Sequence, residues 1–127
     1  MPLLPEPVAV DALPPNNTTY SQAVRLGDLL FLSGQLGIDP ATRRIVEGGI
    51  EAQTKQAIQN IITVLTAAGS SLDRVAKVNI FIRDFSALPL MNKVYGPYFK
   101  HRPAKTTVEI TGLDQGALIE IEVVAAA

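Results

Sequence analysis

Lys105 is the residue whose type and position point most directly to chemistry. Pro103 fixes the backbone before it, and a run rich in β-branched residues follows it over 106–110. The pattern predicts a strand that begins with one positive charge. A lysine ammonium can pair with an anion as a point charge, although a lysine on an exposed strand more often only keeps the surface soluble.

Glu120 lies in a second regular pattern, near the C-terminus. Glu120 and Glu122 alternate with three apolar residues over 119–123, which a strand with one face in water explains fully. A carboxylate in such a strand can align a water molecule or take up a proton. By pattern alone, however, the two glutamates predict a solvated face and no site.

The composition excludes several other kinds of site. The sequence contains no cysteine, so disulfides, thiolate nucleophiles and cysteine-ligated metals are excluded. Its single histidine, His101, is too few for a zinc or iron centre, or for the paired acid and base of a ribonuclease. We therefore expect no metal site.

Length and charge limit the architecture and the partners. The 127 residues fit one domain, 1–127, in which residues 1–16 form a Pro-rich N-terminal segment. Charged residues make up 18% of the chain, below the typical value of about 25%, which predicts a homo-oligomer that covers part of the surface. The net charge is -1 and the basic residues are scattered, so we expect no nucleic-acid partner and no membrane partner.

The N-terminal segment has no targeting pattern. It carries five prolines and no basic stretch, so it predicts neither a signal peptide nor a transmembrane helix. We expect a soluble cytoplasmic protein, and we leave a mitochondrial location open.

Along the chain, the spacing of apolar residues changes from a period of two residues to a period of 3.6 residues and back. This change predicts a domain of mixed α and β structure. A helical stripe runs from Ile58 to Leu65 and should end at Gly69. Over 75–83, alternate residues beginning with Ala76 should face the core. The other predicted strands are 21–26 and 29–34, joined by a turn at Gly27–Asp28, and 105–111 and 117–124.

A second helix should follow Ser86, whose side chain can cap its first turn. Pro97 falls inside this helix pattern, which predicts a kink or an early end near Gly96. The resulting order, ββαβαββ, predicts an α+β fold with a mixed sheet and both helices on one face. The other face then needs a cover, and a neighbouring subunit is the obvious candidate.

Seven segments carry a further pattern: TTYSQAV, FLSGQLGI, EGGIEAQTKQAIQNI, SSLDRVAKVNIFIRDF, MNKVYGPYF, RPAKTTVEI and IEIEVVA. In order and spacing they resemble the RidA/YjgF family of enamine/imine deaminases, also called the endoribonuclease L-PSP family. The resemblance covers nearly the whole chain, and its middle segments are most similar to fungal or other eukaryotic members.

The resemblance implies a fold similar to that of Bacillus chorismate mutase and a homotrimer with a small-molecule cleft at each subunit interface. It also implies a reaction. Members hydrolyse 2-aminoacrylate and related imines to 2-keto acids and ammonia, and they need neither a metal nor an organic cofactor.

Roles for individual residues follow from the same resemblance. The carboxylate-binding arginine of the family falls on Lys105, and its water-orienting acid falls on Glu120. Thr107 takes the place of a cysteine whose backbone, in many members, helps to hold the water or the substrate. Four further residues match positions that line the pocket: Tyr20, Ser33, Gly34 and Asn92.

A lysine in place of the arginine keeps the charge but loses the planar fork that binds a carboxylate through two hydrogen bonds. If that loss costs about 1 to 3 kcal/mol, activity on 2-aminoacrylate drops about 5- to 150-fold. Lys105 and Glu120 share one site only if the register of the last two strands, or a partner subunit, puts them on the same surface.

Three functions therefore stay open. The first is an imine deaminase attenuated by Lys105. The second is a trimer that binds small carboxylates without deaminating them. The third is a chaperone-like or translation-inhibiting interaction protein, as described for other members of the family.

Overall fold

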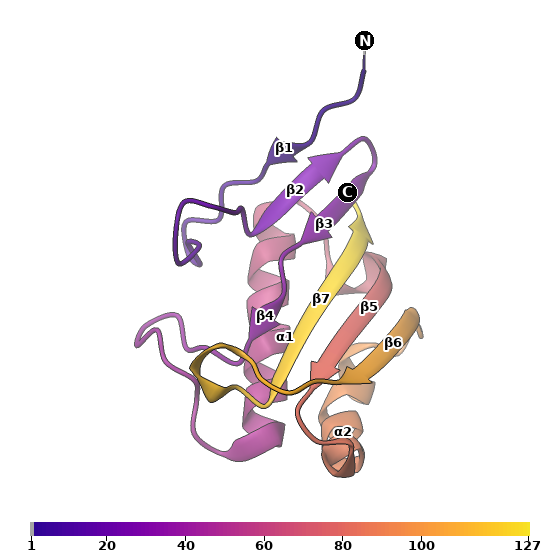
Figure 1. Cartoon of the computed structure of the whole chain (residues 1–127). Helices are drawn as coiled ribbons and strands as arrows, with labels where there is room; N and C mark the ends of the chain where they lie inside the picture. The colour runs from indigo at the N-terminus through magenta and orange to yellow at the C-terminus, as the bar shows by residue number, and fades with distance from the viewer. Residues whose placement is uncertain (1) are drawn as a thin grey trace.

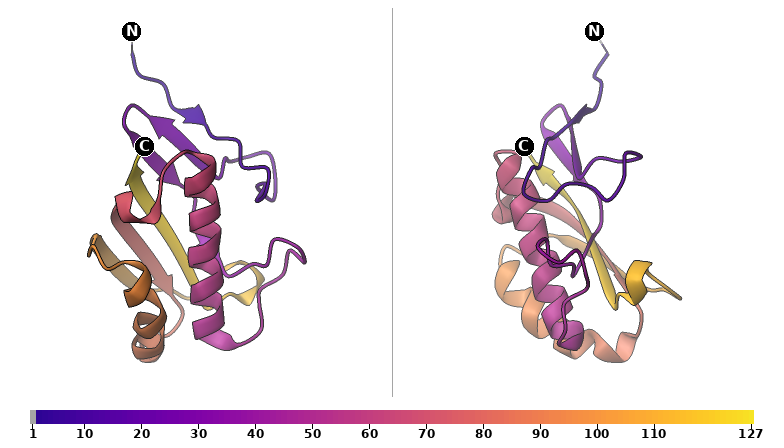
Figure 2. Two further views of the ribbon diagram at one scale, coloured as in Figure 1. Left: turned by 180° about the vertical axis from the view of Figure 1, so that it is seen from behind. Right: turned by 90° about the vertical axis from the view of Figure 1, so that its left-hand side faces the viewer.

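Two helices lie on one face of a seven-stranded sheet in the computed structural model, which describes residues 2–127 (Figure 1). They are α1 (Gly49–Ala67) and α2 (Leu88–Tyr98). The right-hand view of Figure 2 shows both helices on the same side of the sheet. The predicted α+β class is confirmed. Neither helix within residues 2–127 combines the length and the hydropathy of a transmembrane span.

The sheet is mixed because it contains one parallel pair of strands. The strands are β1 (Glu6–Pro7), β2 (Ala23–Leu26), β3 (Leu29–Leu32), β4 (Gln35–Leu36), β5 (Val75–Ile82), β6 (Ala104–Glu109) and β7 (Ile119–Ala126). Their order is β1-β2-β3-β7-β5-β6, and β4 also pairs with β7. β5 and β6 are parallel because α2 joins them as a crossover, and the other pairs are antiparallel.

Turn residues set the ends of the first elements as the sequence predicts. Gly27 and Asp28 form the two-residue turn between β2 and β3, and Gly27 adopts the positive φ of 60° that such a turn needs. α1 ends just before Gly69, whose φ is 78°. The N–H of Ser70 donates to the carbonyl of Leu65 across 2.9 Å, which satisfies a free carbonyl at the helix end. Both predicted boundaries are confirmed.

The start and the end of α2 differ from the prediction. The carboxylate of Asp84 accepts a hydrogen bond of 2.8 Å from the N–H of Ser86 and caps the turn Phe85–Ala87, so Ser86 does not cap the helix, and in the described chain α2 begins after Ala87 without a side-chain cap. A short turn then leads into the helix. The helix continues through Pro97 to Tyr98, since a proline this close to the end removes only one hydrogen bond of the last turn. The helix thus ends two residues beyond Gly96, near which the sequence predicts a kink or an early end.

The core lies between the helices and the inner face of the sheet. Val78, Ile80 and Ile82 of β5 are fully buried there, as predicted. Ala76 is exposed instead, because the register of β5 against β7 is irregular just before Lys77 and turns Ala76 out of the core. The sequence pattern also missed β1 and β4, which span two residues each and are too short to alternate.

Candidate functional site

Lys105 and Glu120 project from opposite faces of the sheet. The strands that carry them are not neighbours, because β5 lies between β6 and β7. Lys105 lies opposite Val78 of β5, which is buried in the core under the helices. Glu120 lies opposite Phe81, three residues further along β5, and therefore faces away from the helices. Within one subunit the two residues do not meet, and each lies in a cleft of its own.

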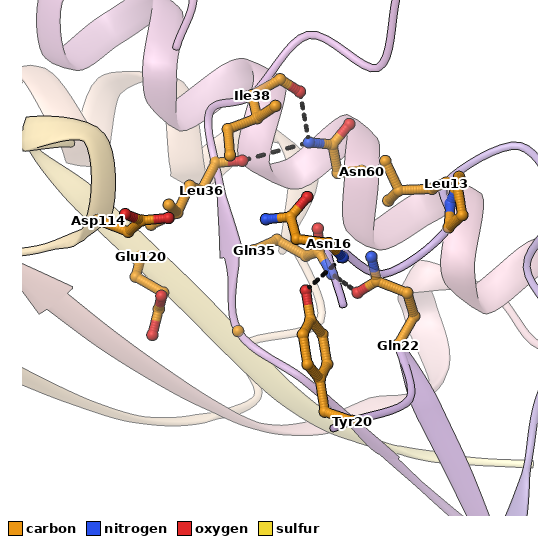
Figure 3. Close-up of a pocket in the computed structure, with 12 residues that line it drawn as sticks. Leu13, Asn16, Tyr20, Gln22, Gln35, Leu36, Ile38, Asn60, Asp114 and Glu120 are labelled. Carbon is orange, nitrogen blue, oxygen red and sulfur yellow. Dashed lines mark hydrogen bonds between the residues drawn. The ribbon is translucent and has the colours of Figure 1, made fainter. Parts of the chain in front are cut away.

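Glu120 lines a cleft of about 220 Å³ beside β4 and the N-terminal segment, here called the Glu120 cleft (Figure 3). Tyr20 and Gly34 line the same cleft, so three of the predicted site residues come together. The Tyr20 hydroxyl accepts a hydrogen bond of 3.1 Å from the N–H of Asn16, which fixes the ring at the mouth of the cleft. Asp114 adds a second carboxylate.

Gly34 allows the side chain of Glu120 to lie against the backbone. A Cβ at position 34 would come within 2.6 Å of Glu120 Oε1 and 2.7 Å of its Cδ. Atoms in a packed protein do not approach that closely, so a larger residue would push the carboxylate away. Gly34 thus helps to fix the position of the Glu120 carboxylate.

The surroundings of Glu120 make its carboxylate a stronger base than an exposed one. Partial burial raises the pKa of Glu120, and the negative charge of Glu122 raises it further. Asn79 donates a hydrogen bond of 3.0 Å to Glu122 Oε1, which holds that second charge in place. Within residues 2–127, no lysine or arginine forms an ion pair with Glu120. A carboxylate in this state can take a proton from water and give it back.

Buried amides hold the backbone around the Glu120 cleft (Figure 3). Asn60 of α1 donates to the carbonyls of Leu36 and Ile38 across 3.2 and 2.9 Å. Gln35 Nε2 donates to Gln22 Oε1 across 2.7 Å. The helix thereby fixes β4, the strand that follows Gly34. Sequence reasoning missed these three amides. For Asn60 a signal was available, because it is a polar residue on the buried side of α1.

Lys105 lines a second cleft of about 420 Å³, between β6 and α2, here called the Lys105 cleft. Asn92, another predicted residue, lines it as well. The Nζ atom of Lys105 lies 4.8 Å from the centroid of the Tyr95 ring, a cation–π contact. Tyr95 is buried and stacks on Phe99, with the ring centroids 4.3 Å apart. The Lys105 ammonium therefore lies against a pair of packed aromatic rings.

Two predicted residues line neither cleft. The Ser33 hydroxyl donates to the carbonyl of Ser21 across 2.6 Å, so it holds two backbone segments together. Thr107 lies opposite Ile80 and faces the same side of the sheet as Lys105, but it does not reach the Lys105 cleft. Neither side chain is therefore placed to contact a ligand in either cleft of one subunit.

The two clefts carry opposite charges. The Glu120 cleft is lined by the carboxylates of Glu120 and Asp114 and by no basic residue. The Lys105 cleft is lined by Lys100, Arg102 and Lys105 and by no acidic residue. In the described part of the chain, no group of three metal-binding side chains comes together.

Known proteins resemble this chain over most of its length. The model of the family described as endoribonuclease L-PSP matches residues 10–127. A RutC family protein of Pyrococcus horikoshii is 46% identical over 84% of this chain and 85% of its own length. A 2-iminobutanoate/2-iminopropanoate deaminase of Dermatophagoides farinae is 38% identical over 95% of this chain and 88% of its own length.

Solved structures have the same fold. A Rid family protein from Yersinia pestis has a TM-score of 0.92 and 39% identity, and the match covers 98% of this chain and 100% of that one. TdcF from E. coli, solved with bound serine, has a TM-score of 0.88 and 27% identity, with coverage of 96% and 98%. Sequence and structure agree, and this chain belongs to the RidA/YjgF family, the family described as endoribonuclease L-PSP.

Proposed function

We propose that this protein is an enamine/imine deaminase that hydrolyses 2-aminoacrylate-type imines to 2-keto acids and ammonia. The observation that carries the proposal is the Glu120 carboxylate, which has a raised pKa and shares a cleft with Tyr20 and Gly34. The family and the deaminase of D. farinae support the same reaction. The serine bound to TdcF supports a ligand of amino-acid size.

Glu120 is the residue that can act on the attacking water. The carbon of a protonated imine is already electrophilic, so the reaction mainly needs a water molecule held about 3 Å away. Glu120 takes a proton from this water as the C–O bond forms, which leaves a hydroxyl and an amino group on one carbon. Glu120 then returns the proton to the nitrogen and takes the proton of the hydroxyl as the C–N bond breaks, so that the carbonyl forms and the departing ammonia takes up this last proton as ammonium. A raised pKa suits a group that must both accept and release a proton.

Lys105 is the residue that we assign to the substrate carboxylate. Because Lys105 and Glu120 face opposite ways in one subunit, a shared site requires a second copy of the chain. A homotrimer provides one if the Lys105 cleft of each subunit faces the Glu120 cleft of the next around a closed ring. The opposite charges of the two clefts favour this pairing.

Carboxylate binding without deamination is the second candidate function, and Lys105 is the observation that favours it. A lysine attracts a carboxylate without the two parallel hydrogen bonds of an arginine, so the substrate is held less firmly in one orientation. A loss of about 1 to 3 kcal/mol of oriented binding would slow the reaction about 5- to 150-fold. At the upper end of this range, binding would be the main property left.

The test generates 2-aminoacrylate in situ and compares keto acid release by the wild type, Lys105→Arg, Lys105→Ala and Glu120→Ala. If the wild type releases keto acid faster than the buffer control and Glu120→Ala does not, the result supports the deaminase. A wild type equal to the control, with turnover restored by Lys105→Arg, supports carboxylate binding. An active wild type that is indifferent to both alanine changes contradicts the proposed site.

A further inference from the structure

The Lys105 cleft holds more positive charge than one carboxylate needs. Lys100, Arg102 and Lys105 line it, and no acidic residue does. Among residues 2–127 the only ion pair joins Lys93 to Glu51, so none of these three exposed cations forms an ion pair within the subunit. Like charges that share a cleft repel one another, and a bound anion relieves the repulsion. The cleft therefore suits a ligand with more than one negative charge.

One wall of the cleft is apolar and rigid. Tyr95 and Phe99 are buried, and their rings stack with an interplanar angle of 18°. Pro103 adds further apolar surface. The Lys105 cleft, at about 420 Å³, is also larger than the Glu120 cleft, at about 220 Å³. A short methylene chain gains from contact with such a wall, whereas an inorganic anion does not.

The loop that carries Lys100 and Arg102 is anchored to the core. His101, which lies between them, donates a hydrogen bond of 2.9 Å from Nε2 to the carbonyl of Val75. The N–H of Arg102 donates to the carbonyl of Phe99 across 3.0 Å. Arg102 adopts a φ of 57°, a left-handed conformation that is unfavourable for a residue with a Cβ. These hydrogen bonds hold the backbone that carries Lys100 and Arg102 in one position.

We infer that the Lys105 cleft selects imino and keto acids that carry a second carboxylate. This inference rests on the proposed function and names its substrate class. The carboxylate beside the reacting carbon pairs with Lys105, the methylene groups lie along the apolar wall, and the distal carboxylate pairs with Lys100 or Arg102. Imines of this class form when an oxidase or a dehydrogenase oxidises the amine of an acidic amino acid.

Calorimetry with stable keto acids tests the inference without turnover. 2-Oxoglutarate should bind the wild type about 5- to 10-fold more tightly than 2-oxobutanoate, because it makes one further charged contact. The Lys100→Gln/Arg102→Gln double variant should bind 2-oxoglutarate and 2-oxobutanoate with similar affinity. Lys93→Gln is the matched control, since Lys93 lies on α2 but does not line the cleft, and it should keep the preference. Salt at about 1 M shortens the screening length to about 3 Å and should reduce the preference of the wild type for 2-oxoglutarate.

Two results would overturn the inference. One is equal affinity of the wild type for the two keto acids. The other is displacement of 2-oxoglutarate by inorganic phosphate at equal concentration, which would indicate an unselective anion site.

Turnover separates this inference from the proposed function. Ammonia release is measured with 2-iminoglutarate and 2-iminobutanoate, each generated in situ by an amino-acid oxidase. A protein that deaminates both imines equally contradicts the inference alone. A protein that prefers 2-oxoglutarate in calorimetry but deaminates neither imine contradicts the proposed function alone.

Discussion

The side chain of Glu120 lies against the backbone of Gly34 so closely that a Cβ at Gly34 would come within 2.6 Å of Oε1. We therefore expect Gly34→Ala to displace the carboxylate. A shift of about 1 Å in a catalytic group can cost about 100-fold in rate, so keto acid release should fall by that order. The measurement is kcat with an imine generated in situ, beside a thermal melt that checks folding.

Gly112→Ala is the control for this substitution. A Cβ at Gly112 meets no atom within 4 Å, so the change adds the same methyl group without a clash. Its kcat should stay near that of the wild type. A Gly34→Ala variant that is equally active would show that the reaction does not depend on the position of the Glu120 carboxylate.

The cation–π contact between Lys105 and Tyr95 predicts a change in substrate binding. Such a contact contributes about 0.5 to 2 kcal/mol and restrains a flexible side chain. Tyr95→Leu should therefore raise KM about 2- to 30-fold, with a smaller effect on kcat, while Tyr95→Phe keeps the ring and should leave KM near the wild-type value. Steady-state kinetics gives both constants.

A double-mutant cycle with Lys105→Met tests whether Tyr95 acts through Lys105. The effects of Tyr95→Leu and Lys105→Met on kcat/KM should be less than additive, because each change removes the same contact. Tyr98→Leu, on the same helix, is the comparison and should combine additively with Lys105→Met. Full additivity of Tyr95→Leu and Lys105→Met would mean that Tyr95 has only a packing role.

The Tyr95 hydroxyl predicts an effect on stability. Within the described chain it is buried without a hydrogen-bond partner, and burial raises the pKa of Tyr95 to about 12. Tyr95→Phe removes an unsatisfied polar group, so the free energy of unfolding should stay the same or rise by about 1 kcal/mol. Denaturant unfolding measures this change. A clear loss of stability would show that the hydroxyl has a partner in the assembled protein.

Glu120 predicts a dependence of stability on pH. Its pKa is raised in the folded state, so the folded protein binds this proton more readily than the unfolded chain does. Stability therefore falls as the pH rises from the ordinary glutamate value of 4.5 through the raised value. Glu120→Gln should melt at a higher temperature than the wild type at neutral pH, and the difference should vanish below about pH 4.5. Glu47→Gln, at an exposed position, should melt like the wild type at both pH values.

Long elements of the fold could be predicted from the sequence, and short ones could not. The stripe of α1 and the alternation of β5 repeat over many residues, so one irregular position such as Ala76 does not hide them. β1 and β4 have two residues each, and tertiary contacts alone define them. Ser86 fits a helix cap by its residue type, but only the structure shows that its N–H bonds to Asp84 and that, among the described residues, α2 begins after Ala87 without a side-chain cap.

The residue types of the candidate site came from the family resemblance, but their arrangement did not follow from the sequence. Tyr20, Gly34 and Glu120 share one cleft, while Asn92 and Lys105 share another. The separation arises because β5 lies between β6 and β7, a strand order that alternation within each strand does not encode. The extra cations of the Lys105 cleft lie in a loop, where no periodicity marks them.

We propose that Lys105 of one subunit and Glu120 of the next form one site. Mixed oligomers of Lys105→Ala and Glu120→Ala, prepared from equal amounts of two inactive variants, test it most directly. In a random ring, about a quarter of the interfaces join an intact Lys105 cleft to an intact Glu120 cleft. Keto acid release should therefore recover to about a quarter of the wild-type rate. Mixed oligomers that stay as inactive as the two separate variants would contradict a site shared between subunits.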